Sequence, residues 1–235
     1  MIFKTRSNII NFWSIVEGLP EIEPISLGRE YLPDWFKTLR RFTNFDNPTV
    51  KNCPSFVDFH RQGYVMKMWC DSILTLDGWE TSSDQYRWSY HDSGQFIEHL
   101  PKHKQLEYKK VYKTVCPWYV KTPKNISMIQ MPMFYDYNPE FEVLPGIVDT
   151  DFHHELNQQV VIKKDKVLIK KGTPLCMYIP IRREEFKMSQ SDETPELEKI
   201  RKKSKLNMFS RFTDSYRQKQ KDMMKSGDYK CPHHK

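Results

Sequence analysis

The chain has 235 residues, of which 38% are hydrophobic, 29% charged and 14% aromatic. This composition excludes collagen-like, coiled-coil and wholly disordered proteins, because the aromatic residues supply bulky material for a core. There is also no run of about 20 apolar residues that could span a bilayer. We therefore expect a globular chain of one domain, or one domain with an appendage.

The first fifty residues contain four prolines that interrupt any long element, and residues 32–39 predict a short helix. Residues 63–71 are rich in aromatic and apolar side chains and predict a strand. Asp77-Gly78 predicts a hairpin turn, after which residues 79–90 could return as the partner strand. Residues 96–110 are polar and predict a loop or a short helix.

The stretch from Lys113 to Ile181 has the most regular pattern, because turn residues separate short apolar segments. The predicted strands are residues 118–120, 127–133, 146–152, 159–162, 167–169 and 175–181. Many short strands at this spacing indicate an all-β sandwich or barrel. We therefore predict a mainly β domain over residues 1–188 with small N-terminal helices.

After Phe186 the composition changes to a polar linker over residues 189–195. Residues 196–226 lack Pro and Gly and predict one amphipathic helix, and we expect residues 227–235 to be a disordered tail. The apolar stripe of the helix consists of Leu206, Phe209, Phe212, Tyr216 and Met223.

The net charge of +7 is concentrated at the C-terminal end, where residues 191–235 hold 12 basic and 7 acidic residues. Any contact with nucleic acid is expected there, but we favour a solvated charged helix as the explanation. The five cysteines are widely spaced, odd in number and without a CxxC pair, which indicates a reducing compartment. Lys4 and Arg6 precede an apolar segment, but Asn11 and Glu17 interrupt it. We therefore expect a cytoplasmic protein that is not secreted.

Polar side chains cluster after Pro145, at Asp149, Asp151, His153 and Glu155. On a strand these four residues would share one face. Such a face could hold a divalent metal ion, or it could supply a carboxylate that orients and deprotonates a water molecule. An exposed polar edge strand beside a turn explains the same residues.

Residues 146–152, with Glu155 after them, resemble a motif of the trimeric dUTPase and dCTP deaminase family. That motif runs Gly, two apolar residues, Asp, a variable residue, Asp, Tyr and a later Glu. Residues 169–179 are similar to the next box of the family, in which a Gly turn leads into a strand. Residues 122–128 stand where the family has its Pro-Arg-Ser phosphate box, so the resemblance extends over residues 118–181.

The resemblance implies a β-clip fold, with its core at about residues 113–186, that binds a nucleotide at the subunit boundaries of a homotrimer. It implies Asp149 as the water-activating carboxylate, with Asp151 as a second catalytic residue. It places Phe152 against the base, and Lys124 and Ser127 against the phosphates.

The chain departs from the family pattern at several positions. Phe152 stands in place of Tyr, Lys124 replaces Arg, and the C-terminal Gly-rich arm has no counterpart. Lys is a poor substitute where a planar fork grips phosphate. These departures leave open a dUTPase-like nucleoside triphosphate pyrophosphohydrolase, with Mg²⁺ as its cofactor, and a nucleotide-binding protein that has lost this activity.

A second resemblance covers residues 20–186. Its motifs, at residues 32–36, 50–55, 117–123, 146–151 and 172–184, are similar to a family of phage and marine bacterial proteins of unknown function. It implies a phage-encoded protein in the cytoplasm of an infected cell. The alternative to nucleotide handling is then a non-enzymatic accessory or virion-associated scaffold, whose C-terminal helix docks a partner.

Overall fold

The computed structural model describes residues 8–84, 86–204 and 212–227. The described residues divide into two compact units. The first contains residues up to Tyr31 together with Gly63–Glu184, and the second contains Leu32–Gln62 together with the residues from Glu185 onward. Residues 32–62, which the sequence places within a domain over residues 1–188, therefore cluster with the C-terminal helices.

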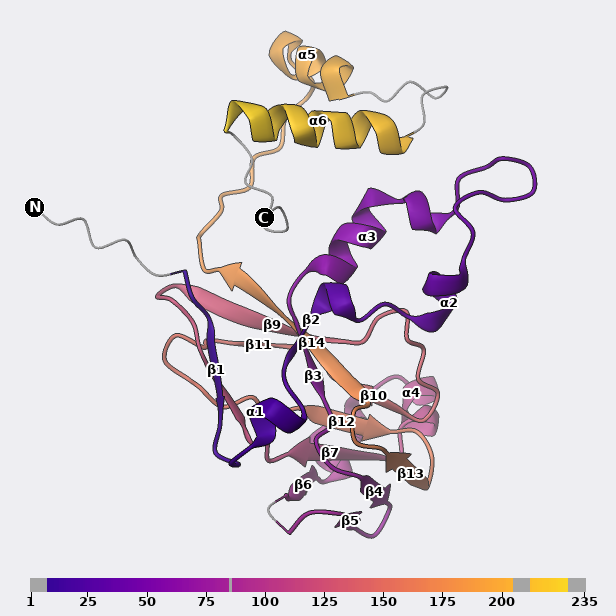
Figure 1. Ribbon diagram of the computed structural model, residues 1–235, viewed down its shortest axis with the longest axis vertical. Helices are drawn as coiled ribbons and strands as arrows, with labels where there is room; N and C mark the ends of the chain where they lie inside the picture. The colour runs from indigo at the N-terminus through magenta and orange to yellow at the C-terminus, as the bar shows by residue number, and fades with distance from the viewer. Residues whose placement is uncertain (1–7, 85, 205–211, 228–235) are drawn as a thin grey trace, which may run out of the picture. The chain divides into compact units, whose positions relative to one another are not determined.

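The first unit is mainly β, as the sequence predicts (Figure 1). Its described residues form fourteen strands in four antiparallel sheets. The five-stranded sheet has the order β11 (Gly146–Val148), β9 (Ile126–Pro132), β14 (Pro174–Arg182), β3 (Tyr64–Lys67) and β2 (Ser26–Leu27). The four-stranded sheet has the order β10 (Phe141–Val143), β12 (Gln159–Ile162), β7 (Lys110–Thr114) and β6 (Trp88–His91).

Two smaller sheets complete the β unit. One has three strands in the order β13 (Lys166–Ile169), β4 (Ser72–Thr75) and β5 (Trp79–Thr81). The other pairs β1 (Asn11–Ser14) with β8 (Trp118–Lys121). Short helices lie between strands, at α1 (Leu19–Ile22) and α4 (Lys102–Glu107).

The central strand of the largest sheet is β14, which pairs with β9 on one side and β3 on the other. Tyr178 and Met128, from β14 and β9, are fully buried in the core. The approach of β3 requires a glycine, because Gly63 has φ +71° and a Cβ there would lie 2.3 Å from the carbonyl oxygen of Tyr178.

A network of buried polar side chains crosses this core. Gln158 accepts a hydrogen bond from Thr114 at 2.7 Å and donates one to the Tyr178 hydroxyl at 2.7 Å. That hydroxyl donates to Gln130 at 2.7 Å, and Gln130 donates to the carbonyl of Leu144 at 2.7 Å. The network connects β7, β9 and β14 and satisfies polar groups that would be costly to bury alone.

The second unit is helical. Its helices are α2 (Asp34–Thr38), α3 (Pro54–Arg61), α5 (Pro195–Ser204) and α6 (Phe212–Ser226). Phe56 packs between Phe36 and His60, with ring centroids 4.8 and 4.3 Å apart. Gln220 of α6 donates a hydrogen bond to Asp58 of α3 at 3.3 Å.

In the segment predicted as one helix over residues 196–226, the described residues form α5 and α6, and residues 205–211 lie outside the described part of the chain. Of the predicted stripe, Tyr216 and Met223 are 40% and 48% exposed. Leu206 and Phe209 lie outside the described residues, as does the side chain of Phe212.

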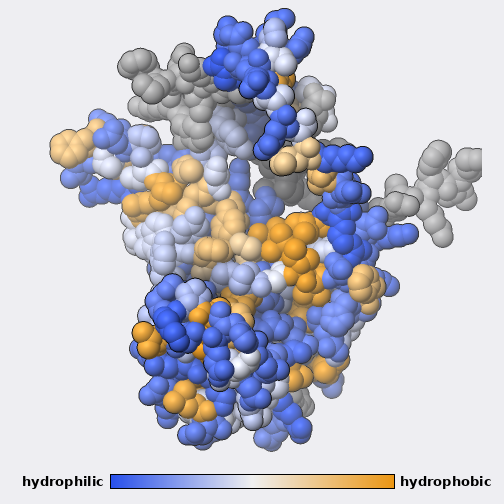
Figure 2. Space-filling view, turned by 180° about the vertical axis from the view of Figure 1, so that it is seen from behind, coloured by the Kyte–Doolittle hydropathy of each residue, from blue (hydrophilic) through white to orange (hydrophobic). Residues whose placement is uncertain are grey.

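No helix in the described part of the chain is long and apolar enough to cross a membrane. On the face seen in Figure 2, hydrophilic residues predominate and apolar residues gather in a few patches. Within residues 146–155, the exposed large apolar side chains are those of Ile147 and Phe152, at 65% and 70%.

Candidate functional site

The segment after Pro145 forms a short strand and then a turn. β11 pairs with β9 only as far as Val148, which lies opposite Met128. The backbone N–H groups of Phe152 and His153 then donate to the carbonyl of Asp149 at 3.2 and 2.9 Å. The prediction of a strand over residues 146–152 is therefore wrong for its second half.

The turn is held from inside by Thr150, which is fully buried. Its hydroxyl shares a hydrogen bond of 2.8 Å with the hydroxyl of Thr122. A polar side chain anchored in this way reverses the chain where a strand would have continued. As a consequence Asp149, Asp151, His153 and Glu155 do not lie on one strand face.

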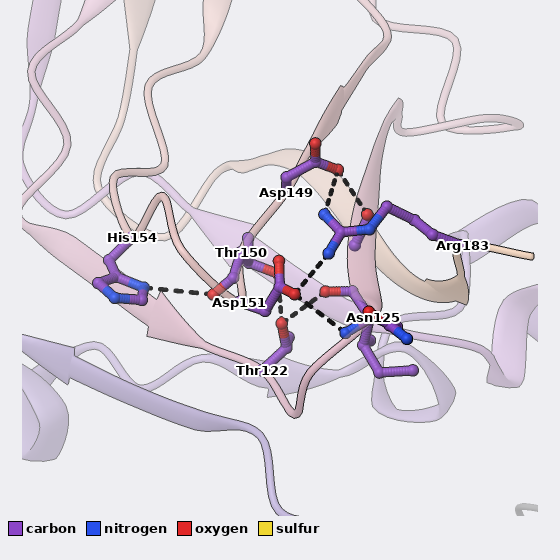
Figure 3. Close-up of polar contacts among 9 residues, drawn as sticks. Thr122, Asn125, Asp149, Thr150, Asp151, His154 and Arg183 are labelled. Atoms are coloured by element: carbon purple, nitrogen blue, oxygen red, sulfur yellow. Dashed lines mark hydrogen bonds and ion pairs between the residues drawn. The ribbon is translucent and has the colours of Figure 1, made fainter.

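Both aspartates of the turn bind the same guanidinium (Figure 3). Arg183, just beyond the end of β14, contacts Asp149 Oδ1 through Nη1 at 2.9 Å and Asp151 Oδ2 through Nη2. Ser127 of β9 donates its hydroxyl to Asp149 Oδ1 at 2.6 Å. The backbone N–H of Asn125 donates to Asp151 Oδ2 at 2.9 Å.

These contacts determine the charge of the turn. The hydrogen bond from Ser127 and then that from Arg183 hold the pKa of Asp149 below its usual value. Burial raises the pKa of Asp151, but the Asn125 N–H and the charge of Arg183 outweigh it, so the net shift is downward. Both side chains are carboxylates at neutral pH, and each is a weaker base than an ordinary aspartate.

The two predicted phosphate contacts have different environments. Ser127 is fully buried and its hydroxyl is committed to Asp149, so it positions that carboxylate. Lys124 lines a hollow of about 430 Å³ together with Arg182 and Arg183. We call this the basic hollow; its remaining lining residues are Asn8, Pro123, Asn125, Ile126 and Glu184.

Asp149 lines a second hollow of about 400 Å³, which we call the polar hollow. Phe152 is at its edge, 70% exposed, and the guanidinium of Arg183 lies 5.6 Å from the ring centroid. Its other lining residues are Lys113, Gln130, Gly146, Ile147, Val148, His153, Glu155, Asn157 and Gln159. The two hollows share no lining residue, but Asp149 of the polar hollow and Arg183 of the basic hollow form an ion pair.

No family model and no curated protein matches the chain. Three similar solved structures are dUTPases of staphylococcal phages. A mutant of the Staphylococcus bacteriophage 80alpha dUTPase has a TM-score of 0.37 and 10% identity, over 80% of this chain and 99% of that one. A second 80alpha mutant, solved with dUpNHpp, has a TM-score of 0.35 and 10% identity, over 80% and 91%.

The third is a mutant dUTPase of phage phi11 of S. aureus, described with a structural Mg(II) ion. Its TM-score is 0.35 and its identity 9%, over 80% of this chain and 99% of that one. The chain is thus weakly similar in structure to phage dUTPases. At this level the similarity assigns neither an activity nor a ligand to the chain.

The predicted metal ligands do not form a metal site. Within residues 8–84, 86–204 and 212–227, no three His, Cys, Asp or Glu side chains are grouped so that they could hold an ion. Asp149 and Asp151 both face Arg183, and Glu155 accepts a hydrogen bond from Asn157 at 3.1 Å. The residues present therefore do not fit a resident divalent cation, which needs several open oxygen ligands.

Arg183 is the residue of the site that the sequence analysis did not single out as functional. The feature of the sequence that could have indicated Arg183 is the pair Arg182-Arg183, which directly follows the predicted strand over residues 175–181. A guanidinium is planar and carries five donors, so it can bind two carboxylates at once. The backbone N–H of Arg183 also donates to the carbonyl of Asn125 at 2.9 Å, and this hydrogen bond aligns Arg183 with the turn.

Proposed function

We propose that the chain binds a nucleoside phosphate, with the base and sugar in the polar hollow and the phosphates in the basic hollow. The observation that carries this proposal is the ion pair of Asp149 and Arg183, which links a lining residue of the polar hollow to one of the basic hollow. A nucleotide also has a polar part and a charged part, because its base and sugar are uncharged and form hydrogen bonds, whereas its phosphates are anionic. The hollows have volumes of about 400 and 430 Å³, and each is in the size range of small-molecule sites.

Each proposed contact follows from exposure and charge. Phe152 is exposed at the rim, so its ring can stack on a base. Asp149 is ionised, so its carboxylate can accept a hydrogen bond from a sugar hydroxyl. Arg182 forms an ion pair with Glu184 at 3.6 Å in a solvent-exposed position, and together with Lys124 it can bind phosphate oxygens.

Calorimetry on the full chain with the common deoxynucleoside triphosphates and Mg²⁺ tests this proposal. We expect Phe152→Leu to weaken the binding of the preferred nucleotide by about tenfold, the usual value of one stacked base. Lys124→Gln should weaken it by a similar factor and reduce its salt dependence. Lys166→Gln, at an exposed position of strand β13, is the matched control. Absence of binding to the unmodified chain, or an equal loss in the control, contradicts the proposal.

We further propose that any hydrolysis depends on Asp149 as the base. In this step a water oxygen would attack a phosphorus atom, pyrophosphate would leave, and the water proton would pass to the carboxylate. Because Ser127 and Arg183 lower the pKa of Asp149, turnover should be slow. Pyrophosphate release should disappear in Asp149→Asn. If both proteins release none, the chain binds nucleotides without hydrolysing them.

A second proposal is a non-enzymatic scaffold whose C-terminal helices dock a partner. Leu197 and Ile200 of α5, one turn apart, are 43% and 60% exposed. If this face serves a partner, replacing both residues with Gln should leave the melting temperature unchanged. A lower melting temperature would assign the face to the packing of its own unit.

A further inference from the structure

Strand β1 is an edge strand of the β unit (Figure 1). It pairs with β8 on one side, and no other strand in the described part of the chain pairs with it. The free side of an edge strand offers unpaired N–H and C=O groups to any further strand. This edge can therefore accept a second strand, unless its own residues prevent the pairing.

The backbone groups at the free edge belong to alternate residues of β1. Val120 lies opposite Phe12 and donates its N–H to the carbonyl of His154 at 2.9 Å, so this N–H is not available to β1. Opposite residues of an antiparallel pair alternate between hydrogen-bonded and non-hydrogen-bonded pairs, and Phe12 and Val120 are a pair of the second kind. The N–H and C=O groups of Phe12 therefore point away from β8, as do those of Ile10 and Ser14.

Both faces of β1 carry apolar side chains. Ile10 and Phe12 pack against the core of the β unit. On the opposite face, Ile9, Trp13 and Ile15 are 63%, 39% and 69% exposed. The outer face of an antiparallel sheet is usually polar, and an apolar outer face along a free edge is typical of an interaction surface.

The strand also lacks the residues that normally prevent edge pairing, which are charged residues, proline and bulge-forming glycine. Residues 8–16 contain none of these. Other strands at the ends of sheets do contain them, since β5, β10 and β13 carry Glu80, Glu142 and Lys166, and β11 begins with Gly146. The free edge of β1 is thus unprotected, whereas these other edges are protected.

The charges on either side of the strand favour a second copy of this chain as the partner. Two basic residues, Lys4 and Arg6, precede residues 8–16, and two exposed acidic residues, Glu17 and Glu21, follow them. In an antiparallel pair of identical strands, the acidic flank of each copy comes next to the basic flank of the other. The strand itself adds no charge that would repel its copy, so the edge is complementary to itself.

We propose that two copies of the chain pair through β1 and form a dimer. The two small sheets then join into one sheet of four strands, in which the β1 strands of the two copies are the central pair. The proposal does not depend on nucleotide binding, since residues 9–15 line neither the polar nor the basic hollow.

The register of this pairing follows from the free backbone groups. The N–H of Val16 already donates to the Ser14 hydroxyl at 3.0 Å, so the free edge ends at Ser14. The three residues with free groups are centred on Phe12, and the two-fold axis of the dimer passes through this position. Ile9 then lies opposite Ile15 of the partner subunit on the exposed face.

Analytical ultracentrifugation of the full chain over a range of concentrations tests the proposal. We expect the unmodified chain to be a dimer. Ile15→Lys should weaken dimerisation by about a hundredfold, because each dimer loses the burial of two isoleucines and gains two lysines at the edge. Leu106→Lys, at a position of α4 that is 76% exposed, is the matched control and should dimerise normally.

Three results would overturn the proposal. The first is a chain that stays monomeric at every concentration, which would leave the edge to a strand of another protein. The second is a dimer that Ile15→Lys and Leu106→Lys affect equally. The third is a trimer.

Disulfide cross-linking tests the register and does not depend on the folding of Ile15→Lys. A mixture of Ile9→Cys and Ile15→Cys chains should form linked dimers under mild oxidation. Facing residues of a non-hydrogen-bonded pair have Cα atoms about 4.5 Å apart, which a disulfide can bridge. A mixture of Ile9→Cys and Leu106→Cys chains should form no more linked dimer than the unmodified chain. Equal yields from the two mixtures would show that the proposed pairing is wrong.

Discussion

The hydroxyl of Tyr178 connects the two halves of the buried polar network, so its removal should destabilise the β unit. Tyr178 is 1% exposed; it donates to Gln130 Oε1 and accepts from Gln158 Nε2, each at 2.7 Å. Tyr178→Phe removes one oxygen without removing the ring. Gln130 Oε1 then loses its donor, while Gln158 Nε2 retains its bond to the carbonyl of Leu156 at 2.6 Å.

The expected loss of stability follows from the two hydrogen bonds that Tyr178→Phe removes. One buried acceptor without a donor costs about 1–3 kcal/mol, and the second lost bond adds about 1 kcal/mol. We therefore expect the free energy of unfolding to fall by about 2–4 kcal/mol. Since Phe fills the same space, no cavity contributes to this cost.

Urea unfolding followed by tryptophan fluorescence measures this loss, because Trp69, Trp88 and Trp118 are buried in the β unit. The midpoint should fall while the slope of the transition stays the same. Tyr90→Phe, at an exposed position, is the control and should change stability by less than about 0.5 kcal/mol. A change in Tyr178→Phe as small as that of the control would refute the reasoning.

Three other predictions concern stability and reactivity. Contacts with Asn125 and Arg183 lower the pKa of Asp151 below its value in the unfolded chain. These contacts therefore stabilise the fold at any pH above the unfolded pKa, and the stabilisation is lost as the pH falls through the folded pKa. Melting temperatures of Asp151→Asn should therefore fall less between pH 5 and about pH 2 than those of the unmodified chain; equal slopes would contradict this. Gly63→Ala should cost more than about 1 kcal/mol in urea, whereas Gly78→Ala, with open space around its Cα, should not. Burial raises the pKa of the Cys116 thiol to about 12, so mass spectrometry should show no alkylation of it at pH 8 until the chain is unfolded.

Much of the β unit could be predicted because its signals are local. Each of the six strands predicted between residues 118 and 181 has a counterpart, because turn residues separate apolar segments, although the one predicted over residues 146–152 ends at Val148. β10 was missed because three residues are too few to show alternation. β1 was missed because its pairing with β8 depends on residues about a hundred positions away.

The candidate site could be predicted only in part. The sequence singled out Asp149, but it could not show that the chain turns there, since a buried threonine inside the turn has no pattern of its own. The role of Arg183 depends on the register of β14 against β9, in which Ile181 lies opposite Ser127. That register places the guanidinium beside two carboxylates from a distant segment, and no short-range pattern encodes it.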